Sequence, residues 1–166
     1  MTDAVRPVLP VPDDLRPGIR AGTVALCHGC FDVLHFGHVN HLEAAARLAD
    51  RLVVSVTDDH HVGKLGRPVF GAADRARVLS ALRVVDTVVV VSEPDALAVI
   101  DALRPDIFVK GSDYLVPQRD ARRAAQFRAE SDLVASYGGR VVHTAEPAFS
   151  TTEVLNRVLD ASRYVG

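Results

Sequence analysis

The feature that most constrains the fold of this chain is a regular alternation of short β-branched runs with segments of helical periodicity. The runs cover residues 23–27, 51–56, 87–91, 107–109 and 140–143. Between them, apolar residues recur at helical spacing: Val39, Leu42, Ala46 and Ala49, then Ala76, Leu79 and Leu82, then Leu97, Ile100 and Leu103. Strands that alternate with helices form a parallel sheet covered on both faces. The sequence therefore predicts a doubly wound, Rossmann-like α/β fold with about five parallel strands.

The length of 166 residues and the 48% share of apolar residues suit one domain with a buried core. Residues 1–20 contain four prolines and no helical periodicity, so we expect an extended or disordered leader there, followed by the domain at 21–166. In open sheets of this type, ligands bind beyond the carboxyl ends of the strands. We expect the functional site at that edge.

Charge and cysteine usage exclude several classes of function. The net charge of -2 gives no basic footprint for a nucleic-acid backbone. Cys27 and Cys30 share one strand-like run, which favours free thiols in a reducing cytoplasm over a disulfide scaffold. No apolar stretch approaches the length of a membrane span, and no signal segment is visible, so we expect a cytoplasmic protein with no membrane partner.

The segment 29–38, with the sequence GCFDVLHFGH, joins the first run to the first helix. A helix N-terminus offers unpaired N–H groups and partial positive charge, which suit a phosphate. Gly37 keeps side-chain bulk away, and the imidazoles of His35 and His38 can donate hydrogen bonds to phosphate oxygens that gain charge during transfer. For either histidine alone, a buried structural histidine or an ordinary polar turn is the commoner explanation. The pair with glycine between them favours phosphate chemistry.

Other phosphate and metal motifs are missing from the sequence. No GxGxxG follows a strand, and Gly63-Lys64 lacks the remaining residues of a Walker loop. A metal site at His35 and His38 needs further ligands, and no Cys, Glu or His cluster supplies them. We therefore predict no protein-bound metal.

The segment 29–38 resembles the HxGH signature of the cytidylyltransferase-like nucleotidyltransferase superfamily. The resemblance implies that His35 and His38 are catalytic and that Mg²⁺ accompanies a nucleoside triphosphate. It also implies nucleotide contacts by Gly29, Cys30, Phe31 and Gly37. Asp32 is expected to orient the acceptor substrate or a metal ion.

Two cations further along the chain extend the resemblance. Lys64 lies in a loop after the second run, and the family has a catalytic lysine in this loop; a solvated surface lysine is the alternative. Arg75 stands in the first turn of a helix, as in the family, and is expected to bind the nucleotide, with a surface salt bridge as the alternative.

Two more segments complete the predicted nucleotide site. Lys110, Gly111 and Asp113 follow the fourth run in a phrase similar to V-K-G-G-D-Y of bacterial heptose 1-phosphate adenylyltransferases, with Ser112 in place of the second glycine. Near the end, Ser150, Thr151 and Thr152 match an S-T-T motif that contacts phosphate in the family. Ser150 with Glu153 also fits a capping box, and both roles are compatible at a helix start.

The resemblance favours ATP as the nucleotide. Glycerol-3-phosphate cytidylyltransferases carry an arginine five residues before the serine of S-T-T, where this chain has Ala145, whereas the heptose enzymes dispense with it. His28 is an observation against the heptose branch, because it replaces a common asparagine before the motif. We expect transfer of AMP to a phosphorylated small molecule such as heptose 1-phosphate, with release of pyrophosphate. The alternative is a cytidylyltransferase that acts on glycerol phosphate, another phosphorylated alcohol or a phosphonate.

The stretch 116–137 is longer than in the heptose enzymes and reads as a helix with a basic face. Most such faces are solvated, but a homodimer contact or a lid over an anionic acceptor is also compatible with it. A homodimer is expected. Two other classes stay open: a domain that senses ATP without turnover, and a flavin or electron-transfer domain with the same architecture.

Overall fold

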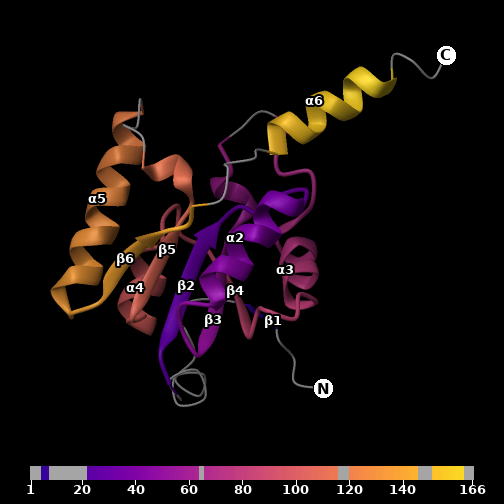
Figure 1. The fold of residues 1–166 in the computed structure, drawn as a ribbon. Coiled ribbons are helices and arrows are strands. Elements are labelled where there is room, and N and C mark those ends of the chain that lie inside the picture. The colour runs from indigo at the N-terminus through magenta and orange to yellow at the C-terminus, as the bar shows by residue number, and fades with distance from the viewer. Residues whose placement is uncertain (1–4, 8–21, 64–65, 116–119, 146–150, 163–166) are drawn as a thin grey trace.

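The computed structural model describes residues 5–7, 22–63, 66–115, 120–145 and 151–162. Within these residues, a six-stranded parallel sheet forms the centre of the molecule (Figure 1). The strands are β1 (Val5–Pro7), β2 (Val24–Gly29), β3 (Arg51–Thr57), β4 (Thr87–Val91), β5 (Ile107–Lys110) and β6 (Arg140–His143). Their order is β1-β4-β3-β2-β5-β6. The doubly wound α/β prediction is confirmed.

Helices cover both faces of this sheet, as Figure 1 shows. They are α2 (Phe36–Ala46), α3 (Ala72–Ser80), α4 (Leu97–Leu103), α5 (Ala121–Ser136) and α6 (Thr151–Ser162), with 3-10 turns η1 (Asp59–His61) and η2 (Ser112–Tyr114). Helices α2 and α3 pack on one face, and α4 and α5 pack on the other. Helix α6 begins near the carboxyl ends of the strands and leads away from the sheet.

The sheet separates two apolar cores because successive strand residues point to opposite faces. Ala25 and Cys27 of β2 join the core under α2 and α3, while Val24 and Leu26 join the core under α4 and α5. Strands buried on both faces need nearly continuous apolar sequence. This requirement explains why the five β-branched runs were visible in the sequence.

The N-terminal segment differs from the prediction at one point. Residues 5–7 form β1, which pairs in parallel with β4 at the edge of the sheet. No periodic pattern marks these residues in the sequence, since three residues are too few to show the alternation that is typical of a strand. The rest of the predicted leader, residues 1–4 and 8–20, lies outside the described residues.

Among the described residues, no helix combines the length and the apolar character that a membrane crossing requires.

Candidate functional site

The carboxyl ends of β2 and β5 lie side by side at the point where the strand order reverses. Cys27 of β2 is in register with Val109 of β5, while β3 and β4 extend the sheet in the other direction. Gly29 and Gly111 therefore end up at the same edge. A doubly wound sheet opens a crevice at this switch point, and ligands bind there.

The two histidines of the HxGH turn lie at the start of α2, at this edge. The rings of His35 and His38 stack with a centroid distance of 3.8 Å. The carbonyl of His35 accepts hydrogen bonds from the amides of His38 and Val39, which closes the first helical turn around Gly37. The structure thus brings both predicted catalytic side chains together.

Burial keeps these imidazoles neutral. The pKa of His38 is lowered to about 3 by burial and, to a smaller extent, by the neighbouring His35 and His41, against an opposing effect of Asp32. Burial also lowers the pKa of His35. Nδ1 of His38 is buried and has no hydrogen-bond partner among the described residues. A neutral ring with an unsatisfied nitrogen can still bind a ligand through a hydrogen bond.

Phe31 and Val33 hold the turn in an unusual backbone conformation. Their φ angles are 52° and 48°, in the left-handed region that a β-branched residue rarely occupies. Such residues cost about 1–3 kcal/mol each and persist where the surroundings fix them. The ring of Phe31 also packs edge-on against His38, at 5.4 Å between centroids.

Asp32 is one of the groups that fix the turn. Its buried carboxylate accepts hydrogen bonds from Arg67 Nη1 at 2.9 Å and from the amides of Val69 and Phe70. These contacts use the acceptor sites of both oxygens. In the structure the carboxylate of Asp32 therefore holds the turn to the loop before α3, and its role in orienting the acceptor substrate or a metal ion stays a prediction.

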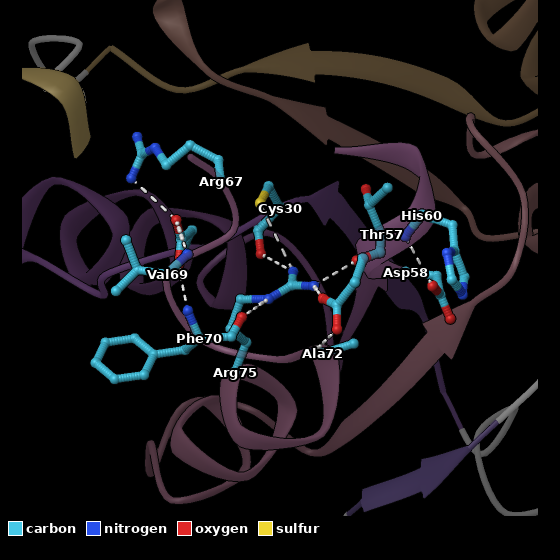
Figure 2. A network of polar contacts seen from close by, with 11 residues as sticks. Cys30, Thr57, Asp58, His60, Arg67, Val69, Phe70, Ala72 and Arg75 are labelled. Atoms are coloured by element: carbon cyan, nitrogen blue, oxygen red, sulfur yellow. Dashed lines mark hydrogen bonds and ion pairs between the residues drawn. The ribbon is translucent and has the colours of Figure 1, made fainter. Parts of the chain in front are cut away.

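Arg75 occupies the centre of a second network (Figure 2). Its Nε donates to the carbonyl of Phe70 at 2.9 Å, and Nη1 donates to the carbonyl of Cys30 and contacts its sulfur. Nη2 donates to the carbonyl of Thr57 and to Asp59 Oδ1, at 2.8 and 2.6 Å. Only 2% of Arg75 is exposed. The guanidinium thus directs its N–H groups at the protein, in contrast to the predicted nucleotide contact.

Lys110 is also enclosed by the protein. Its Nζ lies 2.7 Å from Glu130 Oε2 of α5 and 4.5 to 5.9 Å from the ring centroids of Phe108, Tyr114 and Phe127. Burial is nearly complete for both charged residues. The ammonium of Lys110 therefore forms an internal ion pair with Glu130, and its contact with the nucleotide stays a prediction.

Gly111 and Asp113 follow Lys110 at the edge of the sheet. A Cβ atom on Gly111 would lie 2.7 Å from Asp113 Oδ1, so any larger residue there would push this carboxylate aside. The Asp113 carboxylate pairs with Arg123 of α5, and the same guanidinium lies 4.3 Å from the centroid of the Tyr114 ring. The first turn of α5, which lies within the predicted basic helix over 116–137, thus contacts the predicted nucleotide site through Arg123.

The S-T-T segment reaches the HxGH turn through Thr151. The hydroxyl of Thr151, at the start of α6, donates to the carbonyl of Asp32 at 2.7 Å. Thr152 is exposed. Lys64 and Ser150 lie outside the described residues.

The sequence analysis missed three partners: Asp59, Arg67 and Glu130. For Glu130 a signal was present in the sequence, because it stands at helical spacing from the apolar residues Phe127 and Val134. Val134 is fully buried in the structure. An acidic residue on the core side of a helix indicates a buried cation nearby. Asp59 and Arg67 carried no such signal, since Asp59 begins the short 3-10 turn η1 and Arg67 lies in an irregular loop, and neither segment is long enough to show a periodic pattern.

The site offers Mg²⁺ few protein ligands. Asp32 and Asp113, the two carboxylates predicted at this edge, already pair with arginines. Among the described residues, no group of three or more His, Cys, Asp or Glu side chains is arranged to hold a metal ion. Mg²⁺ retains several waters and binds readily through phosphate oxygens, so this donor set fits an ion that arrives with a triphosphate.

Comparison with known proteins agrees with this geometry. The family model described as cytidylyltransferase-like matches residues 26–157. The bifunctional protein HldE of Syntrophotalea carbinolica is 43% identical over 145 residues, which cover 85% of this chain and 28% of that protein. HldE of Gluconobacter oxydans is 48% identical over 122 residues, or 72% of this chain and 24% of that protein. The chain therefore spans about a quarter of the length of these relatives.

A solved structure shares the fold. The lipopolysaccharide core biosynthesis protein from Thermoplasma volcanium aligns with a TM-score of 0.60 and 27% identity, covering 76% of this chain and 99% of that one. Together with the HxGH turn at the switch point, these matches show that the chain belongs to the cytidylyltransferase-like family of nucleotidyltransferases.

Proposed function

We propose that the protein transfers AMP from ATP to a sugar 1-phosphate, such as heptose 1-phosphate, and releases pyrophosphate. The observation that carries the proposal is the stacked, neutral pair His35 and His38 at a helix start on the switch point of the sheet. Hydrogen-bond donors fixed beside a helix N-terminus stabilise charge that develops on phosphate oxygens. The identity of 43% to an HldE protein supports the adenylyl branch.

In this reaction, a phosphate oxygen of the acceptor attacks the α-phosphorus of ATP in line. The bond from the α-phosphorus to the bridging oxygen breaks, and pyrophosphate leaves with the electron pair. His35 and His38 would donate hydrogen bonds to the transferring and leaving phosphates, and Lys64 would draw the acceptor phosphate close. Gly29, Gly37 and Gly111 would allow the nucleotide to approach the backbone.

Mg²⁺, when bound, would neutralise charge on the triphosphate. The pairing of Asp32 and Asp113 with arginines supports binding of the ion through phosphate oxygens and water.

A homodimer and a cytoplasmic location belong to the same proposal. A pocket of about 460 Å³ between the HxGH turn and α3 has the apolar walls Val33, Leu34 and Phe70, and about half of Phe70 is exposed. An apolar surface of this kind supports a protein contact. The unbonded thiols of Cys27 and Cys30 support a reducing compartment.

A matrix of ATP, CTP, GTP and UTP against heptose 1-phosphate, other sugar 1-phosphates, glycerol phosphate and a phosphonate tests the proposal. Pyrophosphate release is the readout, and ATP with a sugar 1-phosphate is expected to give the highest kcat/KM. Use of CTP with glycerol phosphate would support the cytidylyltransferase instead. ATP binding without turnover on any acceptor would support a sensing domain.

A further inference from the structure

We propose that Arg75 is a positioning residue that fixes three segments of the active edge relative to one another, and that it does not bind the nucleotide. The inference rests on the proposed reaction for its kinetic test. Its structural test is independent of the acceptor.

Each of the three segments accepts hydrogen bonds from a different nitrogen of the Arg75 guanidinium. Cys30 belongs to the HxGH turn, Thr57 and Asp59 follow β3, and Phe70 precedes α3. These segments precede Arg75 by 5 to 45 residues in the sequence, and they meet around its guanidinium in Figure 2. Three of the acceptors are backbone carbonyls, so their recognition does not depend on the neighbouring side chains.

The donors of Arg75 are already used within the protein. A guanidinium has five N–H groups in a rigid fork, and Arg75 makes five contacts at hydrogen-bond or sulfur-contact range. A phosphate contact would require at least one of these bonds to break in a site that is 2% exposed. A buried acceptor left without its donor is costly, so the geometry favours the internal role.

The network leads directly to the catalytic pair. Cys30 precedes Phe31, whose ring packs against His38. Phe70 accepts from Arg75 through its carbonyl and donates to Asp32 through its amide. The loop before α3 is therefore joined to the HxGH turn in two ways, through Arg75 and through the hydrogen bonds that the loop donates to Asp32. A displacement of Arg75 would shift Phe31, and with it the ring of His38.

Asp59 sets the orientation of Arg75. Its Oδ1 pairs with Nη2 at 2.6 Å, and its Oδ2 accepts from the amide of Ala72 in the first turn of α3. Arg75 lies in the same helix. Asp59 thus holds both the guanidinium and the helix that carries it, and offers a second point at which to test the network.

The experiment is a double-mutant cycle of Arg75→Lys and Asp59→Asn, with Arg77→Gln on the exposed side of α3 as the matched control. A misplacement of about 1 Å costs about 100-fold in rate. We expect kcat to fall about 100-fold for Arg75→Lys and about 10-fold for Asp59→Asn, with ATP affinity by calorimetry within about threefold for both. The double variant should lose about 100-fold rather than 1000-fold, because the residues act as a unit.

The acceptor-independent readout is the titration of His38 by NMR. In the wild type, burial keeps the pKa of this ring near 3. Arg75→Lys and Asp59→Asn should each raise the pKa of His38 toward its ordinary value, while Arg77→Gln should leave this pKa unchanged. This measurement stays valid if the wild type shows no turnover, which would overturn the proposed function alone. If Arg75→Lys does not fold, the titration of His38 in Asp59→Asn alone still tests the inference.

A direct nucleotide contact predicts the opposite results. Arg75→Lys would then weaken ATP binding by well over threefold, and Asp59→Asn would leave kcat unchanged or tighten ATP binding, since Arg75 is released. The two effects would be additive, and the His38 titration would not move. Any of these results would overturn the positioning role.

Discussion

The ammonium of Lys110 lies 2.7 Å from Oε2 of Glu130, and 3% and 0% of these residues are exposed. The pair joins the carboxyl end of β5 to the middle of α5. Glu130 also accepts from the amide of Ala96 and the side chain of Gln126. Burial raises the pKa of Glu130, but the charge of Lys110 and the hydrogen bonds from Lys110, Ala96 and Gln126 together outweigh burial, so the pKa lies below its ordinary value. The edge of the predicted nucleotide site is therefore held by a charge pair inside the molecule.

Breaking this pair should destabilise the protein. Glu130→Leu leaves the Lys110 ammonium buried without its carboxylate, and the loss of one partner of a buried pair costs about 3–5 kcal/mol. Urea unfolding at neutral pH measures the free energy of unfolding. The double variant Lys110→Met with Glu130→Leu should recover most of the loss, because two apolar side chains need no partner. A double variant as unstable as Glu130→Leu would show that packing, not charge, holds the contact.

Replacement of His38 should abolish turnover without unfolding the protein. His38→Ala removes a donor beside the developing charge, and such a loss typically costs about 100–1000-fold in kcat. His35→Ala should behave in the same way. Steady-state pyrophosphate release measures the effect, and circular dichroism checks the fold. His60→Ala, at an exposed position in η1, is the control and should retain wild-type turnover.

The stability of the protein should decrease below about pH 6.5. The pKa of His28 is lowered to about 4 by burial and by the charge of Lys110, against an opposing effect of Glu130. The unfolded chain therefore binds a proton between about pH 6.5 and 4 that the folded chain does not, so stability is present above this window and is lost as the pH falls through it. One such group contributes up to about 1.4 kcal/mol per pH unit.

The variant His28→Asn tests this assignment. His28 Nδ1 lies 2.9 Å from the hydroxyl of Ser55, a contact that an amide can also make. The free energy of unfolding, measured in urea from pH 7 to 4.5, should depend less on pH in the variant than in the wild type. An unchanged pH dependence would assign the effect to other groups, with His38 as the first to examine.

ATP should be preferred over CTP by at least about tenfold in kcat/KM, which corresponds to about 1.4 kcal/mol of differential binding. Ala145 stands where the cytidylyltransferase phrase has arginine, and the segment from Lys110 to Tyr114 is similar to the adenylyltransferase phrase. Steady-state rates with both nucleotides and one working acceptor measure the ratio. Equal or better use of CTP would reject the choice of nucleotide and leave the reaction class intact.

The elements with the strongest local signals were predictable from the sequence. β4 and β6 have the predicted bounds, and β2, β3 and β5 differ only at their ends. Their apolar sequence follows from burial on both faces of the sheet. The HxGH turn was also predictable, because its function requires particular residues at fixed spacing within one short segment.

The sequence by itself determined the doubly wound fold, the family and the place of His35 and His38. Only the tertiary structure decided what the charged residues around them do. Arg75 and Lys110 carry the charge that a triphosphate binder needs, yet their partners Asp59 and Glu130 come from other segments and enclose them. A cation at a phosphate site and a cation in an internal pair look alike in sequence, because the difference lies in which acceptors the fold brings within hydrogen-bond distance.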